Sequence, residues 1–324
     1  MTDRGQILST FLLKSGFSSW NRQPLTGDAS SRRYERLTNG GKTRILMDCP
    51  PELDQSLGRF ISVSSQLNNA GLCAPAIEHC DENQGFVIME DLGALTYANW
   101  LSAPETDETQ LYLATVDVFE RLNEIQIPSD FDRLDPPHAA QMITPAMDWY
   151  ATHACADAKA AIISELGTVL AHVAPHPNTF ALRDFHAENL IWRPDQLGLA
   201  KIGLLDFQDA VAAQATYDVV SLLTDARRDV DEHAARVTKS AMMRALSQDK
   251  DEFDAEFAAV SIQRNLRILG IFARLAERDG KTRYLEFMPR VWRHIDDALN
   301  HPVMTTLRPL VQDAFLSPQE KYSR

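Results

Sequence analysis

The 324-residue sequence has few cysteines, few cations and no long apolar run, and each shortage excludes a class of protein. Its four cysteines form no Cys-x-x-Cys pair, so no disulfide framework is expected. Lys and Arg total 32 against 45 Asp and Glu, a formal net charge of −13, which opposes binding to nucleic acid or to an anionic membrane. No stretch approaches the roughly 18 consecutive apolar residues of a membrane span. We therefore expect a cytoplasmic protein without nucleic-acid or membrane partners.

The patterns that are present divide the chain into a strand-rich beginning and a helical remainder. Residues 31–48 predict a hairpin around Asn39-Gly40-Gly41, and residues 86–90 predict another strand. Helical periodicity dominates afterwards, at 54–70 within the first part and then at 107–126, 139–152, 157–173 and 215–316. The order predicts an α+β protein with a small antiparallel-sheet lobe over 1–92 and a large, mainly helical lobe over 93–324.

A strand-rich island at 180–206 interrupts the helical part and carries the sequence's most informative polar residues. Its apolar segments 190–192 and 200–205 predict a hairpin, which we expect to share a small sheet with 180–182. Asp184, Asn189 and Asp206 would then gather at one end of that sheet. Two carboxylates and an amide offer oxygen ligands, which Mg²⁺ prefers. The island therefore predicts a magnesium site.

Two other interpretations of the island remain open. The aspartates could cap turns and bind nothing. Alternatively, Asp184, His186 and Glu188 could share one strand face and hold Zn²⁺ or Fe²⁺ in a metal hydrolase. That hydrolase would need further histidines nearby, and His172 and His176 lie at an ordinary helix end.

The spacing Asp-x-x-x-x-Asn with a downstream Asp resembles the catalytic loop of protein kinases and its metal-binding aspartate. Here the residues are Asp184, Asn189 and Asp206, the last followed by Phe207. In that scheme Asp184 orients the acceptor hydroxyl and takes its proton. Asn189 and Asp206 hold the Mg²⁺ that bridges the phosphates of ATP.

Segments along nearly the whole chain resemble the aminoglycoside-phosphotransferase-like branch of the kinase superfamily, and within it the anomeric kinases of N-acetylmuramate and N-acetylglucosamine. The supporting segments are GDASSRRYERL (27–37), LMDCPPE (46–52), EDLG (90–93), DFHAENLIWRP (184–194), LLDFQDAVAAQATYDVVSLLTDARRDV (204–230) and QRNLRILGIFARLAERDGKTRYL (263–285). The resemblance implies a bilobal protein-kinase-like fold, in which the lobe over 1–92 binds the nucleotide and the lobe over 93–324 holds the catalytic loop, the metal site and the sugar-binding helices. It also implies ATP- and Mg²⁺-dependent phosphorylation of the C1 hydroxyl of these amino sugars, in peptidoglycan recycling.

The sequence departs from the kinase pattern at the phosphate-binding lysine. The strand that should supply it offers Met47, and the helix predicted at 54–70 lacks the glutamate that would pair with that lysine. We expect the turn before the first hairpin to compensate through its backbone N–H groups and a cation. Its candidate nucleotide-binding residues are Gly27, Ala29, Ser30, Ser31, Arg32 and Arg33. A plain surface turn is the alternative.

Other candidates follow from position or from the resemblance. Glu90 and Leu92 lie at the lobe junction, where kinases bind adenine. Asp218 caps a helix and, by resemblance, braces the catalytic loop. The candidates for contact with the sugar are Gln208, Asp209, Trp149, Arg227 and Arg264, with Arg228 and Arg267 as further partners for the lactyl carboxylate of N-acetylmuramate.

Three functions compete for this sequence. The first is a sugar 1-kinase, expected to act as a monomer on a small amino sugar. The second is a kinase for another small alcohol, such as an aminoglycoside or a choline-like compound. The third is a nucleotide-binding pseudokinase, which the missing lysine and glutamate favour and the intact Asp184, Asn189 and Asp206 oppose.

Overall fold

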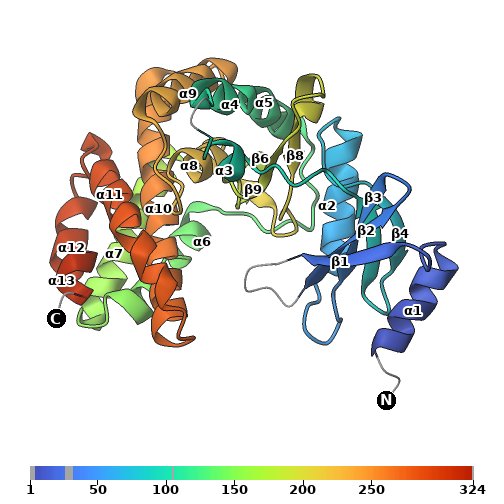
Figure 1. Ribbon diagram of the computed structural model, residues 1–324. Coiled ribbons are helices and arrows are strands. Elements are labelled where there is room, and N and C mark those ends of the chain that lie inside the picture. Colours follow the sequence, from blue (N-terminus) through green and yellow to red (C-terminus); the bar gives the residue numbers. More distant parts are fainter. Residues whose placement is uncertain (1–3, 26–31, 104–105, 323–324) are drawn as a thin grey trace. The chain divides into compact units, whose positions relative to one another are not determined.

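The structure, a computed structural model, describes residues 4–25, 32–103 and 106–322, which divide into two compact units. The first unit comprises Met1–Ala103 with Glu188–Asp209, and the second comprises Pro104–Ala187 with Ala210–Arg324. Strands dominate the first unit and helices the second, which confirms the α+β prediction (Figure 1). The segment 188–209 packs with the strand-rich unit although it lies far beyond residue 92. The assignment of nucleotide binding to 1–92 and of catalysis to 93–324 stays a prediction.

The first unit is built on a five-stranded antiparallel sheet with the order β1-β2-β3-β5-β4. Its strands are β1 (Asn21–Leu25), β2 (Arg33–Asn39), β3 (Lys42–Asp48), β4 (Ile77–Asp81) and β5 (Phe86–Glu90). The predicted hairpin is confirmed as β2–β3, in which Asn39 pairs with Lys42. Gly40 and Gly41 connect them with φ angles of 55° and 81°, the positive values that a tight hairpin turn requires.

The two edge strands, β1 and β4, were not predicted. Both are largely exposed, so neither shows the apolar alternation that marks a half-buried strand. Pro24 in β1 further weakens the strand pattern, and its missing N–H is tolerated at a sheet edge.

The α-helices among the described residues of the first unit are α1 (Arg4–Lys14), α2 (Leu57–Asn69) and α3 (Tyr97–Trp100). Helix α1 buries Leu8, Phe11 and Leu12 in one cluster with Leu37 of β2 and Phe86 of β5, so it covers part of the sheet. The chain leaves α1 through residue 16, a glycine with φ of 81°.

The predicted hairpin at 190–205 is confirmed as the ribbon of β7 (Leu190–Trp192) and β8 (Ile202–Leu204). A 3₁₀ turn, η2 (Gly198–Lys201), connects the two strands. The Leu204 N–H donates to the Cys73 carbonyl at 2.7 Å, and the Trp192 N–H donates to the Leu95 carbonyl at 2.8 Å. A Cβ at Gly203 would lie 2.9 Å from Leu92, so glycine permits this close approach. These contacts attach the ribbon to the first unit.

The second unit is helical around one large apolar core. Its helices are α4 (Glu108–Ala114), α5 (Val116–Glu124), α6 (Pro136–Gln141), η1 (Ala146–Tyr150), α7 (Ala156–Val173), α8 (Tyr217–Leu223), α9 (Glu232–Ala245), α10 (Lys250–Glu277), η3 (Thr282–Phe287), α11 (Met288–Leu299), η4 (Pro302–Met304), α12 (Leu307–Ala314) and α13 (Pro318–Tyr322). The predicted single helix over 107–126 is divided into α4 and α5 at Thr115. At the crossing of α10 with η1, a Cβ on Gly270 would lie 2.1 Å from the Ala146 nitrogen.

The expectation that 180–182 shares a sheet with the 190–205 hairpin is wrong. Strand β6 (Thr179–Ala181) instead pairs with β9 (Val211–Ala213) in a separate ribbon of the second unit. The three residues of β9 are buried, and Val211 and Ala213 join the same apolar core as Ala181. Burial in that core explains the pairing, which local sequence does not reveal.

Among the helices of the described residues, none has the length and apolar character needed to cross a membrane.

Candidate active site

Asp184 lies just beyond β6 in a backbone segment of unusual conformation. The preceding residue, Arg183, has a φ of 71°, which is costly for a residue with a side chain. The buried carboxylate of Asp218, in α8, accepts the Leu182 N–H at 2.6 Å and the Arg183 N–H at 2.9 Å. Asp218 therefore stabilises the turn that presents Asp184, in agreement with the bracing role expected of it.

Cations around Asp184 control its charge. Burial on its own raises the pKa of this carboxyl group, but the charges of Arg264, Arg183 and Arg267 together lower it below its ordinary value. Asp184 is consequently a carboxylate at neutral pH.

Asp184 lines a cavity of about 220 Å³ within the second unit. Its polar wall includes three arginines, namely Arg227, Arg264 and Arg267. Its apolar wall includes Ile268, Ile271, Phe272, Leu275 and Tyr284. The cavity thus combines a carboxylate, clustered cations and an apolar face.

Arg264 is held by neighbours in the second unit, and Arg267 lies among other positive charges. Arg264 is buried, and its Nη2 donates to the Ser221 hydroxyl, which in turn donates to the Arg183 carbonyl. Within the described part of the chain, no hydrogen-bond partner is found for the buried Nε of Arg264. Burial and the positive charges of Arg183 and Arg264 lower the pKa of Arg267. This crowding of positive charge favours an anionic ligand.

His186 is a neutral neighbour of Arg227 in this arrangement. Burial, followed by the charge of Arg227, lowers its pKa to about 4, so the ring is neutral at pH 7. Its Nε2 lies 3.3 Å from Nη1 of Arg227, which donates to it. Within residues 4–25, 32–103 and 106–322, no group of three or more His, Cys, Asp and Glu side chains is placed to hold a metal ion. Among those residues, nothing therefore supports the alternative hydrolase site of Asp184, His186 and Glu188.

The two predicted metal ligands belong to the first unit. Asn189 immediately precedes β7, and Asp206 follows β8 by two residues, so the pairing of Leu190 with Leu204 places both at the same end of the ribbon. The Asn189 carbonyl accepts the Leu205 N–H at 3.0 Å. Asp206 has a φ of 57°, a second non-glycine residue in the left-handed region. An amide and a carboxylate at one ribbon end suit a hard cation.

The candidate nucleotide-binding residues are only partly described. Gly27, Ala29, Ser30 and Ser31 lie outside the described residues. Arg32 is buried and donates to Asp54, Ser56 and Gln208, whereas Arg33, the first residue of β2, is exposed. Met47 is completely buried in the sheet.

The lobe-junction candidates have structural contacts of their own. Glu90, the last residue of β5, accepts a hydrogen bond from Arg193 at 3.3 Å. Leu92 is buried in a small cluster with Cys73 and Ile191. Adenine binding at this position stays a prediction.

The predicted sugar-binding residues fall into different places. Arg227 and Arg264 line the cavity beside Asp184, as does Arg267. Gln208 and the exposed Asp209 belong to the first unit, where Gln208 donates to Asp206. Trp149, in η1, packs against the core, and Arg228 pairs with Glu108 at 2.8 Å. The contact of these residues with a sugar stays a prediction.

Sequence reasoning missed several residues around the site. The aromatic residues that line the cavity are Phe272 and Tyr284, which helical periodicity could only mark as apolar. Asp225 accepts the backbone N–H groups of Arg227 and Ala187, and Asp54 pairs with Arg32. No local motif marks either aspartate, because each acts on residues distant in the sequence or on the backbone.

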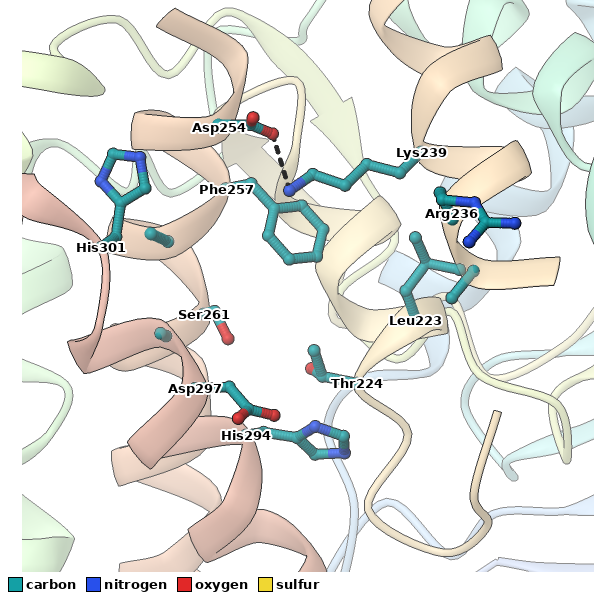
Figure 2. A pocket seen from close by; sticks show the side chains of 13 residues that line it. Leu223, Thr224, Arg236, Lys239, Asp254, Phe257, Ser261, His294, Asp297 and His301 are labelled. Carbon is teal, nitrogen blue, oxygen red and sulfur yellow. Dashed lines mark ion pairs between the residues drawn. The ribbon is translucent and has the colours of Figure 1, made fainter. Parts of the chain in front are cut away.

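A larger cavity of about 410 Å³ lies elsewhere in the second unit, lined by residues of α9, α10 and α11 (Figure 2). Its Lys239 is paired with Asp254 at 2.7 Å and lies 4.3 Å from the ring centroid of Phe257. No residue of the predicted site lines it. The smaller cavity, which contains Asp184, is therefore the candidate acceptor site.

The sequence and the fold of this chain are similar to those of known phosphotransferases. The chain is 33% identical to the N-acetylmuramate/N-acetylglucosamine kinase of Caulobacter vibrioides over 95% of each chain. It is 31% identical to the enzyme of that name from Pseudomonas aeruginosa, over 85% of this chain and 83% of that one. The solved structure of an ADP-bound aminoglycoside phosphotransferase, 15% identical, shares the fold with a TM-score of 0.60 and covers 93% of this chain and 98% of its own. Residues 21–255 match the family described as the phosphotransferase enzyme family, and the chain therefore belongs to that family.

Proposed function

We propose that this chain is an ATP-dependent kinase that phosphorylates the anomeric C1 hydroxyl of N-acetylmuramic acid and of N-acetylglucosamine. The observation that carries the proposal is the 33% identity, over 95% of both chains, to a relative named for these two sugars. The cavity beside Asp184 supports the proposal because it offers a carboxylate for a hydroxyl and an apolar face for a sugar ring.

Asp184 is the proposed catalytic residue. Its carboxylate accepts the hydrogen bond of the C1 hydroxyl and takes the proton as the sugar oxygen bonds to the γ-phosphorus. The bond between that phosphorus and the β–γ bridging oxygen breaks, so that ADP leaves with the electron pair. Asp184 then returns its proton to solvent. The turn stabilised by Asp218 keeps the carboxylate oriented during this exchange.

Asn189 and Asp206 are the residues that would hold Mg²⁺. When bound, Mg²⁺ neutralises the charge of the phosphates. The two side chains fit this ion because both offer oxygen and lie at the same end of the β7–β8 ribbon.

The arginines of the cavity are the proposed binding partners of the acidic sugar. N-acetylmuramic acid carries a lactyl carboxylate, and Arg227, Arg264 and Arg267 line the cavity with Asp184. In a chain with a net charge of −13, such a local excess of cations is what an anionic substrate needs. The same cations disfavour polycationic aminoglycosides and choline, which argues against a kinase for those alcohols.

The test is direct. The protein is incubated with ATP, Mg²⁺ and a panel of sugars and amines, and ADP release is followed together with ³¹P NMR of the acceptor. We expect an acid-labile sugar 1-phosphate from both amino sugars and none from choline or kanamycin. Phosphorylation of an amine-bearing alcohol in place of the sugars would replace this proposal with the second kinase function. Nucleotide binding without any phosphorylated acceptor would favour the pseudokinase.

A further inference from the structure

Arg32 is buried in the first unit, and each of its three guanidinium nitrogens donates a hydrogen bond. Its Nε donates to Asp54 Oδ2 at 2.9 Å, its Nη2 donates to the Ser56 hydroxyl, and its Nη1 donates to Gln208 Oε1 at 2.9 Å. The Arg32 side chain is 4% exposed. Arg32 is therefore directed at these partners in the interior.

Asp54 is held as the charged partner of Arg32. Burial on its own raises its pKa, but hydrogen bonds from Ser56 and the charge of Arg32 lower it to about 2. Asp54 and Ser56 come just before α2, so the ion pair connects the start of β2 to the start of that helix.

Gln208 links Arg32 to Asp206 by hydrogen bonds. Its Nε2 donates to Asp206 Oδ1 at 2.9 Å, while its Oε1 accepts from Arg32. Between them, Phe207 is completely buried and stacks on Phe60 of α2, with ring centroids 4.9 Å apart. The residues next to Asp206 thus make one polar contact, with Arg32, and one apolar contact, with Phe60 of α2.

These contacts oppose the strain in the Asp206 backbone. A non-glycine residue with a φ of 57° persists only where its surroundings hold it. The hydrogen bond from Gln208 also fixes one carboxylate oxygen, as the outer partners of metal ligands commonly do.

We propose that Arg32 is the positioning residue of the metal site and acts on Asp206 through Gln208. The chain Asp54–Arg32–Gln208–Asp206 then takes the place of the lysine–glutamate pair that this sequence lacks at Met47 and in α2. In this arrangement the cation orients a metal ligand rather than the phosphates. The inference rests on the proposed function, because it assumes that Asp206 holds a metal ion with the nucleotide.

The first experiment measures metal affinity separately from turnover. Mn²⁺ is titrated into the full-length protein saturated with ADP, and the free ion is followed by electron paramagnetic resonance. We expect Gln208→Ala and Arg32→Ala each to weaken Mn²⁺ binding by about tenfold, the lower range for outer-shell partners of metal ligands. Arg22→Ala is the matched control, because Arg22 makes an exposed pair with Glu35 in the same sheet and has no part in the site.

The second experiment asks whether the two residues act as a unit. In the double variant, we expect the loss of Mn²⁺ affinity to equal that of either single variant rather than the product of both. Thermal melting identifies any variant that has unfolded, and Gln208→Ala carries the test if Arg32→Ala is unstable. Mn²⁺ affinity within twofold of the unaltered protein for Gln208→Ala would overturn the inference.

The outcomes separate this inference from the proposed function. If the protein phosphorylates neither sugar but the variants bind Mn²⁺ tenfold more weakly, the inference about Arg32 holds and the proposed sugar substrates are wrong. If the protein makes sugar 1-phosphate but the variants bind Mn²⁺ as the unaltered protein does, the proposed function holds and the inference about Arg32 is wrong.

Discussion

The turn that carries the proposed catalytic residue, in the second unit, and the segment that carries the proposed metal ligands, in the first, are stabilised in different ways. Each places a non-glycine residue in the left-handed region, Arg183 in one and Asp206 in the other. In the second unit, the buried carboxylate of Asp218 accepts two backbone N–H groups. In the first, a chain of side chains from Arg32 through Gln208 reaches the carboxylate itself. We therefore expect the arrangement in the second unit to depend on Asp218, and that in the first unit to depend on each side chain between Arg32 and Asp206.

The largest expected effect, on kcat, comes from removing the negative charge of Asp184 while Asp218 still holds the turn. Asp184→Asn should lower kcat on the order of 10³-fold, because the amide cannot take the proton of the hydroxyl. Nucleotide affinity, measured by calorimetry, should stay unchanged. A near-normal kcat would show that another group accepts the proton.

Removing the Asp218 carboxylate should damage stability as well as turnover. Asp218→Ala leaves the Leu182 and Arg183 N–H groups without their acceptor, at a cost of about 2–3 kcal/mol in the free energy of unfolding. Urea denaturation measures this loss. Thr238→Ala, at another buried polar residue of the same unit, is the control and should cost less. A loss below that of the control would mean that water replaces the carboxylate.

The cations of the acceptor cavity should affect one sugar more than the other. Arg227→Gln and Arg267→Gln should raise KM for N-acetylmuramic acid by about tenfold, roughly the value of one charge-assisted hydrogen bond, and KM for N-acetylglucosamine much less. Arg236→Gln, which lies at the larger cavity, is the control. Equal effects on both sugars would remove the carboxylate contact from the proposal.

A smaller effect should appear in the pH dependence of stability. The pKa of His186 is lowered to about 4 in the folded protein, below its ordinary value of 6.5. Between pH 6.5 and pH 4, His186 is therefore protonated in the unfolded chain but neutral in the folded protein. The free energy of unfolding that is present above pH 6.5 is lost as pH falls toward 4. His186→Gln should reduce this loss by on the order of 1 kcal/mol in urea denaturation at pH 7 and pH 5. Parallel profiles for both proteins would contradict the pKa shift.

Local sequence was sufficient where short-range rules decide the structure. The hairpins β2–β3 and β7–β8 were predicted because turn residues and apolar alternation lie next to each other in the chain. The cluster of Asp184 with Arg227, Arg264 and Arg267 was less predictable. Its members come from three segments, and only the resemblance to known kinases linked them.

What the sequence by itself determined is the type of protein: a strand-rich part, a helical part and an Asp-x-x-x-x-Asn motif with a downstream aspartate. Only the tertiary structure decided that β6 pairs with β9 and that Arg32 reaches Gln208, 176 positions away. The physical reason is that buried polar groups and edge strands take whichever partner the folded core brings to them. Such partners leave no periodic or local mark in the chain.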